Sequence, residues 1–348
     1  MVTDLENVSR LLMEVELTPV QGTRFQPTGF PDMGAAIYER PDGKRMILVE
    51  TAQSMANRLE QVCMDGFGPH IAKELEGLPY ILAKLVGDVT SETSSLFEAH
   101  RINSPFIMTG ITTQNQKFKD ILKTEMEYAK GRQIDWKKVA KVLFKYDPNA
   151  LLHGVFLANF EDGRIKIPRA LTGFIEAEDI REAASGGVKN NPLDPTGKIR
   201  AEDYDKDVYS NVPYHRMEFS SSRITAYFNF DLALLDGYGL GKEGKGLLVN
   251  LGLYKIARFL NSGLRLRTAC DFKTAGDVLV KEPASFSFPS DTNLLKQVQE
   301  GIDACRRKKM FADPPVTELN VKVKDKEMAG KETESKEESD ETETEEGR

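Results

Sequence analysis

Hydrophobic and polar residues alternate through the segment 219–231. Every second residue from Ile224 to Phe230 is apolar or aromatic. Because successive side chains of a strand point to opposite faces, this pattern predicts a β-strand with one buried face. A glycine-rich loop follows at 237–246, and then an apolar helix that ends at Gly263. A strand, a glycine loop and a helix in this order can bind a phosphate group, either of a nucleotide cofactor or of a nucleic-acid backbone.

The strand predicted after this helix, Leu264–Asp271, separates the two kinds of phosphate ligand. Leu264 and Leu266 alternate with Arg265 and Arg267. This alternation predicts one face in a core and one cationic face pointing outward. A strand of a dinucleotide-binding sheet is buried on both faces and is continuously apolar. The pattern therefore favours contact with a nucleic-acid backbone.

The glycine loop fits two nucleotide-binding motifs incompletely. Gly239, Gly241 and Gly244 form G-x-G-x-x-G, but the strand after the helix is not apolar on both faces. Gly239 to Lys245 forms the start of a P-loop, but Gly246 stands where a magnesium-binding Ser or Thr is needed. A glycine-rich connector with residues at positive φ is the favoured interpretation. A nucleotide-binding enzyme that uses the 237–246 loop is kept as an alternative.

The N-terminal half contains a predicted strand that leads directly into a helix. The strand, Arg45–Glu50, is apolar in its middle, and a helix with apolar residues on one face starts near Thr51. The free N–H groups at such a helix start can hold an anion, so the polar side of this helix is either a binding surface or an ordinary solvated face. A dense group of hydrogen-bond donors follows at 98–105.

Apolar periodicity predicts two further helices, one near 118–129 and one that begins at Asp135. They would belong to a helical insertion at about 51–147. The dipeptide Asp162-Gly163 predicts a tight turn in a hairpin that spans 151–168.

The stretch 185–215 is rich in Gly, Asn, Asp and Pro and has little apolar periodicity. A segment of this length without a core of its own is either disordered or a functional projection. In order, the elements are compatible with the α+β class, as a ferredoxin-like or RRM-like sheet with two insertions. We expect a single domain over residues 1–325.

Charge is distributed unevenly along the chain. The 348 residues carry a net charge of −7. Residues 326–348 hold ten acids and four bases, so the remainder is close to neutral. This acidic segment is expected to be disordered and to serve as a solubilising tail or as an electrostatic competitor for a basic surface. The acidic balance of the whole chain therefore does not exclude nucleic-acid binding. The last predicted helix, in addition, ends in the basic cluster Arg306-Arg-Lys-Lys309.

Residues for other chemistry are scattered. The three cysteines are isolated, which indicates a reducing cytosol rather than disulfides or a zinc site. No apolar run approaches the length of a membrane span, and the first residues do not form a signal peptide. No histidine stands at metal-ligand spacing, and no G-x-S-x-G motif occurs, although a carboxylate pair stays possible. We expect a binding protein without catalytic residues, metal or cofactor. The histidines are His70, His100, His153 and His215.

Several segments together resemble the backbone subunits of type I-U (I-G) CRISPR effector complexes. These subunits are the Csb branch of the Cas-seven family, within the RAMP superfamily. The similarity runs in chain order over roughly 10–275. It is carried by Arg24-Phe-Gln-Pro-Thr-Gly-Phe-Pro-Asp32, Leu48-Val-Glu-Thr-Ala-Gln-Ser-Met-Ala-Asn-Arg-Leu-Glu60, Asn149-Ala-Leu-Leu-His-Gly-Val-Phe156, Ile167-Pro-Arg-Ala-Leu171, Gly186-Gly-Val-Lys-Asn190, Ile224-Thr-Ala-Tyr-Phe-Asn-Phe-Asp231 and Gly263-Leu-Arg-Leu-Arg-Thr-Ala-Cys-Asp271.

The resemblance implies a RAMP fold and a non-enzymatic role in antiviral defence. Such subunits polymerise along a CRISPR RNA, a projecting thumb displaces bases, and the exposed guide pairs with target DNA. The implied partners are the CRISPR RNA, the target DNA strand, neighbouring copies, a large subunit, a Cas-five/Cas-six-type fusion subunit and a recruited helicase-nuclease, all in the cytoplasm and without a membrane. The segment 185–215 is the thumb candidate. From residue type and position, the expected RNA contacts are Gln53, Asn57, Arg58, His100, Arg101, Asn103, Arg169, Lys189, Asn190, His215, Arg216, Arg265 and Arg267.

One alternative follows from the same superfamily. Type III relatives cleave target RNA with a loop aspartate, which would make this protein a metal-dependent ribonuclease of the RAMP type. Asp32 and Asp65 lie in predicted loops, but neither stands in a motif that matches that aspartate. The type I resemblance predicts no nuclease activity.

Overall fold

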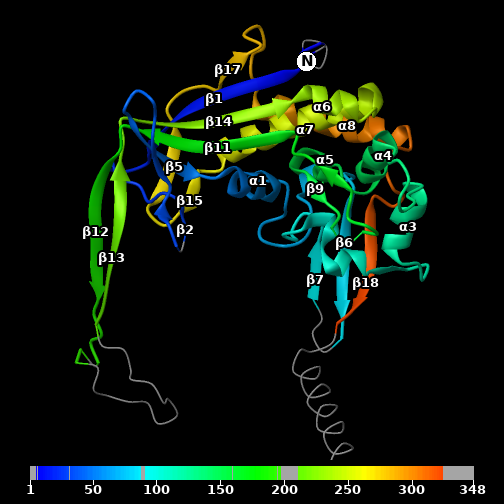
Figure 1. The fold of residues 1–348 in the computed structure, drawn as a ribbon, viewed down its shortest axis with the longest axis horizontal. Coiled ribbons are helices and arrows are strands. Elements are labelled where there is room, and N and C mark those ends of the chain that lie inside the picture. Colours follow the sequence, from blue (N-terminus) through cyan, green and yellow to red (C-terminus); the bar gives the residue numbers. More distant parts are fainter. Residues whose placement is uncertain are drawn as a thin grey trace, which may run out of the picture.

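The computed structural model describes residues 5–323, except 6, 31, 88–90, 159, 194 and 197–210. Its centre is an eight-stranded sheet in the order β15-β16-β1-β14-β11-β5-β4, with β17 also paired to β1 (Figure 1). Helices cover one face of this sheet. In chain order the strands are β1 Arg10–Pro19, β4 Ile37–Glu39, β5 Arg45–Glu50, β11 Leu171–Glu178, β14 Arg223–Asp231, β15 Arg265–Arg267, β16 Cys270–Thr274 and β17 Leu279–Glu282.

Four of these strands, β16-β1-β14-β11, form a ferredoxin-like core. Each neighbouring pair is antiparallel. Helix α1 (Ala52–Gln61) lies in the chain between β1 and β11, and helix α7 (Gly241–Asn261) lies between β14 and β16. With β1, β11, β14 and β16 numbered in chain order, the spatial order is 4-1-3-2, which is that of the split β-α-β fold. The predicted α+β class is confirmed.

The first strand of the core is not the one that the sequence pattern suggested. We expected Arg45–Glu50 to begin the fold, but β1 occupies that position and β5 is an added strand outside β11. In β1, Leu11, Met13, Val15 and Leu17 are buried at every second position. This alternation is present in the sequence, and pairing on both sides makes β1 a central strand.

The core lies between the sheet and α7, whose residues are buried on nearly all sides. Helix α8 (Asp291–Arg307) packs against α7. The close approach of α7 to the sheet depends on Gly252, because a methyl group there would lie 2.5 Å from the Phe230 ring.

A second, four-stranded sheet lies beside these helices. Its order is β7-β6-β18-β8, and β18 pairs with β6 in parallel. The predicted helical insertion therefore contains strands as well as helices. The elements of this region are η2 Lys73–Leu75, β6 Tyr80–Val86, β7 Ser91–Ser94, η3 Arg101–Asn103, α2 Pro105–Met108, β8 Ile111–Thr112, α3 Phe118–Glu125, α4 Trp136–Tyr146, α5 Asn149–His153 and β18 Val316–Lys322.

A two-stranded ribbon extends from the ends of β11 and β14 (Figure 1). Its strands are β12 (Arg181–Lys189) and β13 (Val212–Ser220), which pair in an antiparallel register. This ribbon occupies the region where we expected a projection, and residues 197–210 lie outside the described residues. The acidic segment 326–348 lies outside them as well. The remaining elements are β2 Gly29–Phe30, β3 Gly34–Ala35, β9 Val155–Phe156, β10 Lys166–Ile167 and α6 Leu232–Gly237.

The predicted hairpin around Asp162-Gly163 is shorter than expected. Strands β9 and β10 pair over two residues each, because residues 149–153 form helix α5 instead of a strand. Within the described part of the chain, no helix is long and apolar enough to cross a lipid bilayer.

Candidate nucleic-acid interface

Polar side chains from four separate segments line one hollow with a volume of 820 Å³, which we call the polar hollow. It lies where the start of α1, η3, the α5–β9 junction and β10 meet. Five of the residues expected to contact RNA are among its lining. They are Gln53, His100, Arg101, Asn103 and Arg169.

Arg101 forms part of the inner wall of the polar hollow and is held by Glu60. It donates from Nε to Glu60 Oε1 at 2.5 Å and from Nη2 to Oε2 at 2.7 Å. Both side chains are nearly buried, at 11% and 7% exposure. A two-point pair of this kind fixes the geometry of both groups. Arg101 therefore positions η3 instead of projecting into the hollow as a free cation.

Arg169 lies at the edge of the polar hollow and remains partly exposed. Its Nε donates to the His153 carbonyl at 3.2 Å, and its Nη2 donates to the Gln53 side-chain oxygen. Burial, and then the charge of Arg101, lower the pKa of Arg169. A guanidinium nevertheless stays charged in proteins. Two guanidinium groups thus share this region with one carboxylate, that of Glu60, and the excess positive charge favours an anion such as a phosphate.

Exposed aromatic rings border the same hollow. Phe156 on β9 is 50% exposed, and Lys166 Nζ lies 5.8 Å from the centroid of its ring. A neighbouring hollow of 380 Å³ is lined by Asn57, Phe67 and Phe97 and shares Arg101 with the first. Phe67 is 88% exposed and Phe97 is 54% exposed. Unpaired bases stack on such rings without regard to sequence.

The buried floor of the polar hollow contains His153. Lys255 is fully buried on α7, and its Nζ donates to His153 Nε2 at 2.8 Å. Burial, and then the charge of Lys255, hold the His153 pKa well below its ordinary value. Because Nε2 accepts this hydrogen bond, the ring proton resides on Nδ1. His153 therefore has no free lone pair with which to act as a general base.

A second group of predicted contacts turns inward instead. Arg58 donates from Nε to Glu50 Oε1 at 2.7 Å, and Arg267 donates from Nη2 to Glu50 Oε2. Arg267 also donates from Nη1 to the carbonyls of Gln26 at 3.2 Å and Val49 at 3.0 Å. Glu50 is fully buried. Its carboxylate, buried beside β15, draws both arginines away from solvent.

The expectation of one outward cationic face on 264–271 is therefore wrong for one of its two arginines. Arg265 is 74% exposed, with Asp271 at 3.7 Å, whereas Arg267 is only 24% exposed. The register between β15 and β16 shifts between these two residues. Such an irregularity redirects side chains that strict alternation would place on one face.

The ribbon holds the remaining predicted contacts. Lys189 and Asn190 lie exposed at the end of β12, and His215 is exposed on β13. Arg216 pairs with Glu218 at 3.0 Å. His215 stands opposite Gly186, and its neighbour Tyr214 stands opposite Gly187. Because adjacent residues of a strand face opposite sides, the ribbon presents one ring on each face beside a residue without a side chain.

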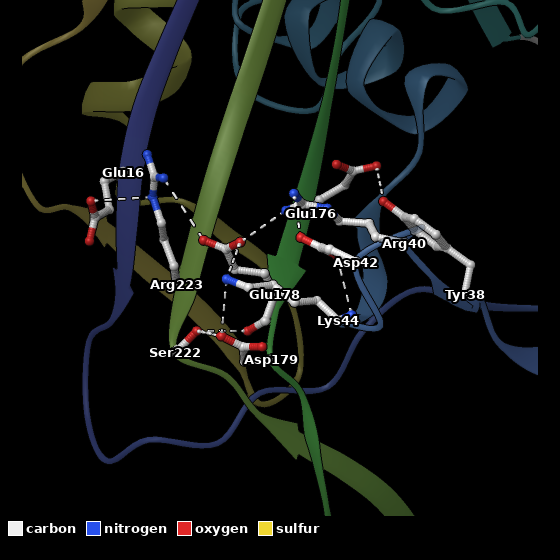
Figure 2. Close-up of polar contacts among 10 residues, drawn as sticks. All are labelled: Glu16, Tyr38, Arg40, Asp42, Lys44, Glu176, Glu178, Asp179, Ser222 and Arg223. Atoms are coloured by element: carbon white, nitrogen blue, oxygen red, sulfur yellow. Dashed lines mark hydrogen bonds and ion pairs between the residues drawn. The ribbon is translucent and has the colours of Figure 1, made fainter.

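The face of the main sheet away from the helices carries a network of charged groups (Figure 2). Arg223 lies 3.6 Å from Glu16 and 3.8 Å from Glu178, and Tyr38 donates to Glu176 at 2.7 Å. In RRM domains this face binds RNA through stacked aromatics. This face also carries a stacked pair, Phe174 and Tyr227, at 5.0 Å between ring centroids, but among the ten residues drawn the carboxylates outnumber the cations, which disfavours phosphates. The ten residues drawn hold five acids, Glu16, Asp42, Glu176, Glu178 and Asp179, and three cations, Arg40, Lys44 and Arg223.

The glycine loop has a structural role at several positions. Gly239 and Gly241 have φ of +65° and +73°, and an added methyl group at Gly244 would lie 2.7 Å from Leu240. Lys245 pairs with Asp236 at 2.5 Å. Strands β14 and β16, on either side of the helix, are separated by β1 in an antiparallel sheet. The loop therefore lacks the parallel β-α-β setting of a dinucleotide site.

Acidic and metal-binding residues do not converge in the part of the chain that the structure describes. No group of three or more His, Cys, Asp or Glu residues there could hold a metal ion. Asp32 and Asp65 lie exposed in different turns, one between β2 and β3 and the other after α1.

Sequence reasoning selected donors from several segments but missed four residues of the interface. Glu60 and His153 stand within apolar patterns and give no local sign of their partners. Phe156 and Lys166 carry a signal that was available, because an aromatic and a lysine face each other across the predicted hairpin.

Comparison with known proteins finds a similarity to one CRISPR-associated family. The model of a family described as CRISPR-associated protein GSU0053 (Cas_GSU0053) matches residues 11–182, nearly half of the chain. A solved structure titled "CRISPR RNA-guided surveillance complex, pre-nicking" contains a chain with 11% sequence identity and a TM-score of 0.38, over 86% of this chain and 89% of that one. No curated protein matches. The matched span contains nearly all of β1, then α1, β11 and the whole lining of the polar hollow, and over this span the chain is similar to that CRISPR-associated family.

Proposed function

We propose that this protein is the backbone subunit of a type I-U/I-G CRISPR effector complex. In this role it binds the CRISPR RNA in the polar hollow, polymerises along it with neighbouring copies, and presents it for pairing with target DNA. Specificity then comes from the guide, so the protein needs contacts only to the RNA backbone and to its shape.

The observation that carries the proposal is the convergence at the polar hollow. Lys166 and Arg169, from β10 and the residues after it, and His100, just before η3, place cationic or donor groups around one cavity. Exposed Phe156 adds a surface on which a base can stack. This combination suits single-stranded RNA, whose phosphates need cations and whose bases need aromatic surfaces.

The ribbon supports the thumb role. It is a narrow element that projects from the sheet, with Tyr214 on one face and His215 on the other. A flat wedge with a ring on each side can separate two adjacent bases and stack against both. Repetition by a head-to-tail contact that does not close then gives an open filament.

Purification of the native complex, followed by sequencing of its RNA, tests the proposal. The expected result is a set of short RNAs with repeat-derived ends and no cleavage of target by this subunit. In the same assay, Lys166→Ala with Arg169→Ala should reduce the bound RNA, whereas Lys296→Ala, at an exposed position of α8, should not. Absence of RNA, with a bound nucleotide found instead, would refute the proposal and favour the glycine loop.

A further inference from the structure

A second hollow, with a volume of 470 Å³, lies between α4, the start of α7 and the end of α8. It shares no lining residue with the polar hollow. Its floor is apolar and its rim is basic, so we call it the lysine pocket. The floor consists of Val142, Phe144, Leu240 and Met310, and the rim consists of Lys138, Lys141, Lys145, Lys309 and Glu125.

The rim has more positive charge than its own acids neutralise. Lys145 pairs with Glu125 at 2.7 Å, and Lys138 pairs with Glu127. Lys141 and Lys309 are exposed and form no ion pair with any residue that the structure describes. The pocket therefore has two cations available to a ligand, Lys141 on α4 and Lys309 in the basic cluster 306–309, and the proposed RNA role uses neither.

The backbone places Lys309 at this rim at an energetic cost. Lys309 has a φ of +55°, a conformation that helices usually assign to glycine just past their end. The Met310 amide donates to the Cys305 carbonyl at 3.0 Å and closes this cap. The same turn directs Met310 into the pocket floor. One cap thus supplies both a cation of the rim and an apolar group of the floor.

The combination fits a peptide better than a nucleic acid. Phosphates would satisfy the lysines, but a base finds no exposed ring in the floor on which to stack, because Phe144 is only 1% exposed. A peptide that carries one apolar side chain between carboxylates satisfies both. Residues 324–348 of this chain are acidic overall, and Met328 is their only large apolar residue. Glu327 and Glu332 lie on either side of Met328, together with Lys326 and Lys331, and most of the acids follow at 332–346.

The length of the chain indicates which copy supplies this peptide. The Ala312 amide donates to the Lys145 carbonyl at 3.0 Å, so the chain passes the pocket there. Strand β18 then leads away for about 20 Å, at roughly 3.3 Å per residue. Met328 follows Val323 by five residues, a reach of at most about 17 Å. Met328 therefore falls short of the pocket of its own chain.

We propose that the lysine pocket binds the acidic C-terminal segment of a second copy of this chain, with Met328 in the apolar floor. The contact would join copies through protein alone. It does not depend on the proposed RNA role, since none of its residues lines the polar hollow.

Photo-crosslinking within the full-length chain tests this contact. The photoreactive residue p-benzoyl-phenylalanine replaces Met328, and copies grown in ¹⁴N and ¹⁵N medium are mixed after ribonuclease treatment. Mass spectrometry should find crosslinks from position 328 to the α4 peptide or to Met310, joining chains of different isotope content. The same photoreactive residue at Thr344 provides the positional control.

A charge reversal completes the test. Lys141→Glu with Lys309→Glu should reduce the crosslink yield at least tenfold, whereas the matched change Lys296→Glu should not alter it. Crosslinks confined to one copy, or a yield unchanged in the double variant, would overturn the proposal. Protection of Lys141 and Lys309 from acetylation by single-stranded DNA, but not by a synthetic 324–348 peptide, would assign the pocket to nucleic acid instead.

Discussion

Replacement of Arg267 by alanine separates a structural role from an RNA contact. The side chain bonds to fully buried Glu50 and to two backbone carbonyls, so its loss leaves a buried carboxylate with one cation instead of two. Breaking a buried pair typically costs about 3–5 kcal/mol. Because Arg58 still holds Glu50 at 2.7 Å, we expect the lower part of that range, about 3 kcal/mol of unfolding free energy.

Urea unfolding followed by far-UV circular dichroism measures this loss, and Arg265→Ala is the matched control on the same strand. Arg265 is 74% exposed, so its removal should change the unfolding free energy by about 0.5 kcal/mol or less. RNA affinity measured on both variants under folding conditions completes the comparison. If Arg267→Ala left the unfolding curve unchanged and weakened RNA binding, the inward role of this residue would be refuted.

Three other changes test the interface and its surroundings. Arg169→Ala should weaken RNA binding about tenfold. It should also reduce the slope of log affinity against log salt concentration by about 0.7, as for one lost phosphate contact. An unchanged slope in a salt titration would contradict this prediction. Phe156→Ala should weaken binding by about 1–3 kcal/mol per stacked base, measured by fluorescence anisotropy with Lys296→Ala as control. Burial raises the Asp147 pKa to about 6. The unfolded chain ionises this acid at lower pH, so the contribution of Asp147 to stability falls as pH rises from about 4 to 6. Asp147→Asn should therefore stabilise the protein relative to wild type at pH 7, by at most about 3 kcal/mol, but not at pH 4.

The local sequence pattern predicted where helices and strands form better than it predicted which strands pair with one another. Helices α1, α3 and α4 and strands β5 and β14 occur where periodicity indicated them, because each repeats its apolar residues with its own period. The position of β1 at the centre could not be predicted in this way, since strand order depends on which distant segments pair. Its alternation was present in the sequence, but nothing local ranks one amphipathic strand above another.

Prediction from residue type has a similar limit for the side chains of the candidate interface. Residue type selected Gln53, His100 and Arg169 as donors, and the fold brings them to one hollow. Residue type also selected Arg58 and Arg267, which the fold assigns to buried Glu50. Whether an arginine meets a carboxylate inside or a ligand outside depends on partners far away in the sequence, and no short motif records them.

The parallel pairing of β18 with β6 has a consequence for synthesis. Residues 80–86 leave the ribosome long before residues 316–322, yet the small sheet has β18 between β6 and β8. Helix α2 packs on both β6 and β18, and η3, which forms part of the polar hollow, packs on α2. Because the central strand β18 is made long after β6, this wall of the hollow is completed only once residues 316–322 have been synthesised. A chain that ended before β18 would then lack a finished hollow and could not join the proposed filament.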